Sequence, residues 1–175
     1  MLILKAFSEN DFTKLFNFTA EVYITAPDEM ILEYMISGPT RHLHFPPSHG
    51  HESRRDELWK TTCLEAFLSP DFIKDSSYLE INCSPNGDWN AYSFSGYRAG
   101  MTPAAATEVK LIGREADQTT AHFRIRIKSP GLDRFKHLGV TAVVEFSDGS
   151  KSYFALKHPG PVADFHNKEG FVHSL

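Results

Sequence analysis

Apolar and polar residues alternate with a period of two along much of the chain, which is the pattern of β-strands that bury one face. The segment 119–129 (TTAHFRIRIKS) alternates almost without exception, and the segment 141–156 contains two apolar runs separated by Asp148 and Gly149. An Asp-Gly pair between two apolar runs is typical of a tight β-hairpin turn. Both patterns therefore predict antiparallel strands with one buried face and one exposed face.

Shorter alternating or β-branched runs predict further strands, each bounded by turn-forming residues. They lie at residues 19–26, 30–37, 57–69, 77–83, 88–94 and 108–112, with short strands at 42–45 and 170–175 and one helical turn within 130–138. Pro46 and Pro47 would end the strand at 42–45, so we expect a long loop over residues 38–53. Nine or ten strands with very little helix predict an all-β fold, an antiparallel β-sandwich of jelly-roll or immunoglobulin-like type. We expect a single domain spanning residues 1–175.

The consecutive strands at 57–69, 77–83 and 88–94, separated by turn compositions at 69–76 and 84–88, carry an unusual second face. In the first two strands one face holds Leu64, Ala66, Leu68, Leu79, Ile81 and Cys83, and the other holds Cys63, Glu65, Phe67, Tyr78, Glu80 and Asn82. If the apolar face lies on the core, two acids, an amide and a tyrosine share the opposite surface. A solvated sheet face usually carries Lys, Thr and Ser, so we interpret this surface as a candidate ligand site.

The two tryptophans flank these strands. An indole ring stacks on pyranose rings, and its N–H donates a hydrogen bond. Trp89 follows the turn at 84–88 and is predicted to border the ligand, whereas Trp59 is expected in the core.

Glu65 and Glu80 admit three roles. They could be the acid and base of a glycosidase, because glycoside hydrolysis needs two carboxyl groups astride the bond. They could also accept hydrogen bonds from sugar hydroxyls, or form structural pairs with arginines such as Arg54, Arg55 or Arg98. Catalysis is the least favoured role, and neither a G-x-S-x-G motif nor a phosphate-binding glycine loop occurs.

The composition, 41% hydrophobic and 23% charged, is that of a soluble globular protein. A net charge of -4 and the lack of basic runs argue against nucleic-acid partners. No segment resembles a signal peptide or a spanning helix, so we expect no membrane partner and a cytoplasmic location. In that compartment Cys63 and Cys83 are expected to be reduced, the alternative being a disulfide between adjacent strands.

Four histidines, His42, His44, His49 and His51, form two His-x-His pairs in the long loop. Alternate strand residues share a face, so such pairs could bind a transition metal. The loop has no nearby cysteine, and a solvated role with no tight metal site is the favoured interpretation. No C-x-x-C-H motif occurs, so any haem would be held non-covalently.

Three segments together resemble a known family: residues 56–72, 78–101 and 141–166, with the motifs LW-x-x-TC-x-E-x-F, E-x-N-x-SP-x-G-x-W and HP-x-x-x-x-DFH. From about Phe45 to the C-terminus the chain resembles the bacterial DOMON-like proteins, which are related to family 9 carbohydrate-binding modules. The resemblance implies a single-domain β-sandwich whose relatives bind sugars or haem, without enzyme activity. The family's motif positions are matched by Trp59, Thr62, Cys63, Glu65, Glu80, Asn82, Ser84, Pro85, Gly87, Trp89, Tyr92, Tyr97, Arg98, His158, Asp164 and His166. Leu64 departs from the family, where Phe is frequent, a change that should only repack the core.

Pattern and resemblance together predict a cytoplasmic, non-catalytic domain that binds a small polar ligand, with a carbohydrate favoured and no cofactor. The candidate ligand-binding residues are Glu65, Tyr78, Glu80, Asn82, Trp89, Tyr92, Arg98, His158, Asp164 and His166. The first alternative is a haem-binding or redox-sensing DOMON-type module, with haem as its cofactor. The second is a glycan-processing enzyme that uses Glu65 and Glu80. The pattern carries no signal for an oligomeric state.

Overall fold

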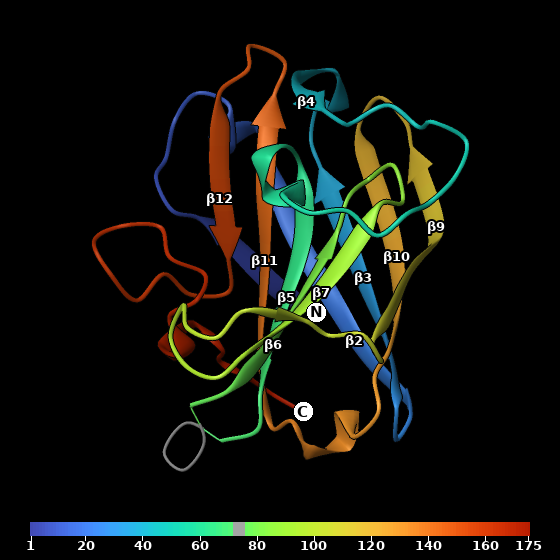
Figure 1. Cartoon of the computed structure of the whole chain (residues 1–175). Helices are drawn as coiled ribbons and strands as arrows, with labels where there is room; N and C mark the ends of the chain where they lie inside the picture. The colour runs from blue at the N-terminus through green and yellow to red at the C-terminus, as the bar shows by residue number, and fades with distance from the viewer. Residues whose placement is uncertain (72–75) are drawn as a thin grey trace.

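The computed structural model describes residues 1–71 and 76–175 as an all-β protein (Figure 1). The strands are β1 (Leu2–Ala6), β2 (Asn17–Ala26), β3 (Glu29–Ser37), β4 (Leu43–His44), β5 (Cys63–Ser69), β6 (Tyr78–Cys83), β7 (Trp89–Phe94), β8 (Thr102–Pro103), β9 (Glu108–Ala116), β10 (Thr120–Lys128), β11 (His137–Phe146), β12 (Lys151–Ala155) and β13 (His173–Ser174). Helical structure within the described residues is limited to the 3-10 turns η1 (Thr13–Leu15), η2 (Thr40–His42), η3 (Leu58–Lys60), η4 (Leu132–Arg134) and η5 (Lys168–Gly170). Part of the turn predicted at 69–76 lies outside the described residues.

The 13 strands form one antiparallel sheet that curls into a half-barrel, in the order β8-β7-β6-β5-β11-β12-β1-β2-β3-β10-β9, with β4 and β13 paired to β11. Figure 1 shows β12, β11 and β5 on one side of the molecule and β3, β10 and β9 on the other. β1 joins these halves, because Leu2–Leu4 pair with β2 while Lys5 and Ala6 pair with β12. The all-β class and the antiparallel pairing are confirmed. The division into two sheets of a sandwich and the count of nine or ten strands are not.

One core fills the space inside the curled sheet. The predicted alternation holds on β10, where Phe123, Ile125 and Ile127 are at most 1% exposed. The predicted core face of β5 and β6 also points inward, since Leu64, Ala66, Leu68, Leu79, Ile81 and Cys83 all belong to this core. Each large aliphatic or aromatic side chain buried in this way stabilises the fold by roughly 1.5 to 3 kcal/mol.

The opposite face of β5, β6 and β7, here called the outer face, is covered as well. Phe67, Tyr78, Tyr92 and Phe94 form a second buried cluster there with Phe171. A methyl carbon at Gly139 of β11 would come within 2.7 Å of the Phe171 ring, so glycine is needed for the C-terminal segment to approach the strand this closely. The C-terminal segment therefore covers the outer face, which on an ordinary antiparallel sheet with one buried face would be open to solvent.

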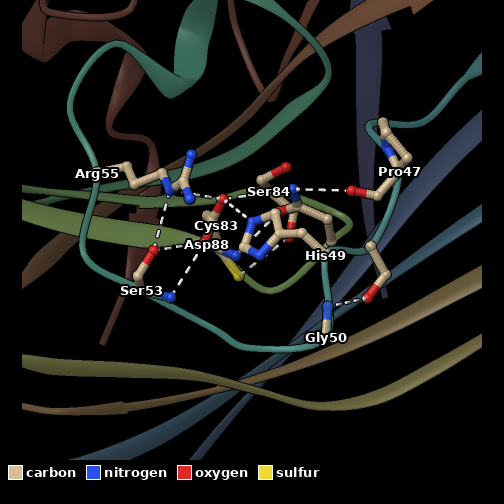
Figure 2. A network of polar contacts seen from close by, with 10 residues as sticks. Pro47, His49, Gly50, Ser53, Arg55, Cys83, Ser84 and Asp88 are labelled. Carbon is tan, nitrogen blue, oxygen red and sulfur yellow. Dashed lines mark hydrogen bonds and ion pairs between the residues drawn. The ribbon is translucent and has the colours of Figure 1, made fainter.

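Asp88 fastens the long loop before β5 to the turn between β6 and β7 (Figure 2). Its Oδ1 accepts hydrogen bonds from the backbone N–H and the hydroxyl of Ser53, both at 3.0 Å. Its Oδ2 lies 2.7 Å from Nε2 of His49 and 3.2 Å from Nε of Arg55. Burial alone would raise the pKa of Asp88, but the bonds from His49 and Ser53 and the charge of Arg55 outweigh it and hold the pKa below its usual value. The carboxylate thus stays ionised and fixes the chain that leads to η3.

Both cysteines are free and buried.

Candidate functional site

A cavity of about 370 Å³ opens on the outer face of β5, β6 and β7. β5 supplies Glu65 and Phe67, β6 supplies Glu80, and β7 supplies Phe94. Trp59, Arg98, Met101, Val143, Tyr153, Ala163, Phe165 and His166 complete the lining. Antiparallel register brings the β5 and β6 residues together, because Glu65 pairs with Asn82 and Phe67 pairs with Glu80.

Two carboxyl groups form the floor of this cavity. Glu65 is 3% exposed and Glu80 is 4% exposed. Oε2 of Glu65 accepts a hydrogen bond from the Thr141 hydroxyl at 3.4 Å, while Oε1 of Glu65 has no partner among the described residues. Asn82 donates to Oε1 of Glu80 at 2.7 Å. A buried polar atom without a partner costs about 1 to 3 kcal/mol, which makes Oε1 of Glu65 the conspicuous unmet acceptor of the site.

Burial favours the neutral forms of both acids. The pKa of Glu65 is raised well above its usual value by burial and further by the charge of Glu80. Burial also raises the pKa of Glu80, although the hydrogen bond from Asn82 and the charge of Arg98 act against it.

His166 lies beside the acids with a defined tautomer. The Tyr78 hydroxyl accepts the backbone N–H of Arg98 at 3.2 Å and lies 2.8 Å from Nδ1 of His166. We assign the hydroxyl as donor to Nδ1, which leaves the ring proton on Nε2, 3.9 Å from Oε2 of Glu80. Burial, reinforced by the charge of Arg98, lowers the pKa of His166 to about 4, so the ring is neutral at pH 7 and forms no ion pair with Glu80.

The rim is held by a second polar cluster. Nη2 of Arg98 lies 2.8 Å from Oδ1 of Asp164, and the Tyr97 hydroxyl donates to Oδ2 of Asp164 at 2.7 Å. Arg98 has a φ of 50°, in the left-handed region that non-glycine residues rarely adopt. These contacts hold that conformation and fasten the chain after β7 to the C-terminal segment, so the rim joins parts of the chain that are more than 60 residues apart in sequence.

Aromatic rings form much of the wall. Phe67 and Phe94 come from the outer face, Tyr153 from β12, Phe165 from the C-terminal segment and Trp59 from η3. Trp59 is 37% exposed, and its ring lies edge-on to that of Tyr92 at 6.2 Å. The cavity thus combines a polar floor with flat apolar sides.

Seven of the ten predicted site residues are brought together here. Glu65, Glu80, Arg98 and His166 line the cavity, and Tyr78, Asn82 and Asp164 hydrogen-bond to lining residues. Tyr92 lies on the same face at the margin, where its hydroxyl donates to Asp56 at 2.6 Å.

Trp89 and His158 lie elsewhere. Trp89 pairs with Cys83, so it points to the core side of the sheet, where the guanidinium of Arg54 lies 4.4 Å from the centre of its ring. His158 lies 2.8 Å from the backbone oxygen of Lys5, to which its Nε2 donates. The expectations for the two tryptophans are therefore reversed: Trp59 of η3 borders the cavity, and the register of β7 turns Trp89 to the core.

Sequence reasoning also missed the remaining lining residues. Parity placed Phe67 on the same face as Glu65, but Phe67 was not named among the candidate site residues. Met101, Val143, Tyr153, Ala163 and Phe165 carry no local signal, because long-range pairing and the path of the C-terminal segment bring them to the cavity.

Among the histidines of the long loop, the rings of His49 and His51 contact each other with their centres 4.7 Å apart, and the other two contact different residues. His44 lies 3.3 Å from Glu145, the ring of His42 lies 5.6 Å from that of Phe12, and His49 contacts Asp88. Across residues 1–71 and 76–175, no group of three or more His, Cys, Asp or Glu side chains is arranged to hold a metal ion. None of the helices in these residues is long and apolar enough to span a membrane.

No protein-family model matches the chain, and no curated protein matches it. Among solved structures, it resembles a "putative carbohydrate-binding protein" from Bacteroides uniformis, with a TM-score of 0.62 and 9% sequence identity over 97% of this chain and 84% of that chain. A DUF4466 family protein from Parabacteroides merdae aligns over 83% of this chain and 44% of that chain at 10% identity, but its TM-score of 0.24 carries no argument. At 9% identity, the likeness to the Bacteroides uniformis protein establishes a shared all-β fold.

Proposed function

We propose that the protein is a non-catalytic binding domain for a small polar ligand, a carbohydrate, held in the cavity on the outer face. The observation that carries the proposal is the carboxyl group of Glu65, buried on the cavity floor with one oxygen unpartnered. A ligand that hydrogen-bonds to this oxygen recovers the cost of leaving it unmet. Small-molecule sites are typically apolar hollows with a few convergent polar groups, and this cavity has that composition.

The spacing of the polar groups suits hydroxyl groups. Nε2 of His166 and Oε2 of Glu80 are 3.9 Å apart, which is too far for a direct hydrogen bond. A sugar hydroxyl between them could accept from one and donate to the other, since it has both functions. The Trp59 and Phe94 rings offer apolar faces for the C–H surface of a pyranose.

The fold likeness to the Bacteroides uniformis protein supports the same ligand class. We therefore propose that the chain is a single DOMON-like domain of β-sandwich type, related to family 9 carbohydrate-binding modules. We further propose that it works in the cytoplasm, without nucleic-acid or membrane partners. The motif residues Glu65, Glu80 and Asn82 support this assignment.

Binding is favoured over hydrolysis by the protonation of the two acids. A glycosidase keeps one carboxyl group protonated and the other ionised at working pH. Here the pKa of Glu65 and that of Glu80 are both raised by burial, so neither acid is shifted toward the ionised form that a glycosidase pair needs.

A non-covalent haem is the second candidate, because the neutral imidazole of His166 and the thioether of Met101 both line the cavity. Histidine and methionine are established axial haem ligands. We rank haem second because a porphyrin edge offers no hydrogen-bond donor to Glu65 or Glu80. A Soret band in the purified protein would reverse this order.

A glycan array followed by calorimetry tests the proposal, with Glu80→Gln as the variant and Glu115→Gln, an exposed change on β9, as the matched control. Gln at position 80 can still accept from Asn82 but loses carboxyl contacts with a ligand. We expect Glu80→Gln to melt no earlier than the wild type and to lose about tenfold in affinity, the size of one hydrogen bond. The proposal fails if no glycan binds, or if Glu80→Gln melts early and its folded fraction binds normally.

A further inference from the structure

The cavity floor contains two acids, and none of the Lys and Arg side chains that the structure describes is paired with them. Among the described residues, no Lys or Arg forms an ion pair with Glu65 or Glu80. Arg98 lines the cavity, but its guanidinium is bound to Asp164 at 2.8 Å, and His166 is neutral at pH 7. Each acid keeps one hydrogen bond, from Thr141 to Glu65 and from Asn82 to Glu80, but an ionised buried carboxylate is costly without a cation, and none of the described side chains supplies one.

The walls suit a cation as well. Five aromatic rings line the cavity: Trp59, Phe67, Phe94, Tyr153 and Phe165. The face of an aromatic ring attracts an ammonium group, and cages of aromatic rings recognise alkylated ammonium groups in other proteins. The acids of the floor and the rings of the wall are independent features that favour the same chemistry.

We propose that the ligand carries a protonated amine, which sits between Glu65 and Glu80, so that the favoured carbohydrates are amino sugars. This inference rests on the proposed function and names its ligand class. The unpartnered Oε1 of Glu65 is the acceptor that an ammonium N–H would fill. The 370 Å³ volume accommodates a single sugar ring of this kind.

Proton release distinguishes this ligand class from neutral sugars. Burial in the cavity raises the pKa of both acids and favours their protonated forms. An ammonium group favours the ionised form, so a carboxyl proton leaves for the buffer as the ligand enters. At about pH 6 an amine of ordinary pKa is already protonated, so the released proton comes from the protein. A neutral sugar adds no charge and should release none.

The test is calorimetric titration at about pH 6 with glucosamine, N-acetylglucosamine and glucose, and with the corresponding galactose series, in phosphate and in Bis-Tris, which both buffer at that pH and differ in ionisation enthalpy. We expect the free amine to bind about tenfold more tightly than its acetylated and hydroxyl counterparts, because charge-assisted hydrogen bonds are about twice as strong as neutral ones. The binding enthalpy of the amine, and of the amine alone, should differ between the two buffers. Glu65→Gln should abolish the preference, and Glu115→Gln should keep it.

The outcomes separate the inference from the proposed function. Equal or tighter binding of the neutral sugars, with no buffer-dependent enthalpy, overturns the amine and leaves carbohydrate binding standing. Failure of every sugar here and on the glycan array overturns both. If Glu65→Gln does not fold, Glu80→Gln takes its place, and the buffer comparison on the wild type decides without any variant.

Discussion

The free energy of unfolding should decrease as the pH falls below 6.5, and the titration of His166 accounts for a defined part of that decrease. Burial and the charge of Arg98 lower the pKa of His166 from 6.5 to about 4 in the folded state. Between these two values the unfolded chain binds the proton and the folded chain does not, so the free energy of unfolding decreases as the pH falls. The decrease due to this residue is about 2 kcal/mol near pH 5 and about 3 kcal/mol below pH 4.

The variant His166→Gln isolates this effect. Glutamine cannot titrate, and its side-chain oxygen can still accept the hydrogen bond from Tyr78. Urea unfolding of both proteins at several pH values gives the free energy of unfolding for each. We expect the difference, wild type minus variant, to shrink by about 2 kcal/mol between pH 8 and about pH 5. An NMR titration of the His166 ring should show no protonation above about pH 5.

A difference that stays constant with pH would refute this reasoning. It would mean that His166 titrates alike in the folded and unfolded states. The ring would then be in contact with water, and the floor of the cavity would not be the dry environment that raises the pKa of Glu65.

Three further changes probe other parts of the account. Trp59→Ala should weaken ligand binding by about 1 to 3 kcal/mol in calorimetry with little change in melting. Trp89→Ala should instead lower the free energy of unfolding by up to about 3 kcal/mol and leave binding intact. The opposite result would restore Trp89 to the site. Glu65→Gln should gain stability relative to the wild type as the pH rises from about 5 to 9, because an acid whose folded pKa is raised destabilises the fold once the pH passes its unfolded pKa. Urea unfolding of both proteins across that range measures the gain. A difference in the free energy of unfolding that does not change with pH would contradict the prediction. Asp88→Asn should lower the free energy of unfolding by about 1 to 3 kcal/mol and speed hydrogen exchange in residues 38–53, because it weakens the hydrogen bonds from Ser53 and His49 and removes the charge paired with the half-exposed Arg55. Unchanged exchange would show that Asp88 does not fasten the loop.

The period-two pattern predicted the strands that bury one face. It placed Glu65 and Glu80 on the face opposite Leu64 and Leu79, and the structure confirms this for β5 and β6. Parity needs only local sequence, since successive strand side chains point to opposite faces. The role of the two acids in ligand binding stays a prediction.

The period-two pattern could not predict which strands far apart in the sequence pair with each other. The apolar start of the chain forms β1, which joins the two halves of the sheet, and nothing local indicates that Leu4 pairs with β2 while Lys5 pairs with β12. The strands β4, β8 and β13 have two residues each, too few to show alternation. A half-barrel in place of two separate sheets follows from these pairings.

The two tryptophans show why the site was only partly predicted. The turn composition at 84–88 suggested that Trp89 points to a ligand, but the register of β7 against β6 sets it opposite Cys83 on the core side. Trp59 lies in η3, where a period of two has no meaning. The place of Asp164 and His166 in the site was indicated by the family resemblance alone, because the packing of the C-terminal segment on the outer face leaves no periodic signal in the sequence.

The central claim is that a ligand enters the cavity on the outer face, and the protein has two tryptophans that report on opposite sides of the sheet. Trp59 lines the cavity, and Trp89 packs against the core. Their indole N–H groups give two NMR signals, which Trp59→Phe assigns. During titration with the best ligand from the glycan array, the account predicts that the Trp59 signal shifts and the Trp89 signal stays. A shift of the Trp89 signal with the Trp59 signal unmoved would contradict the account.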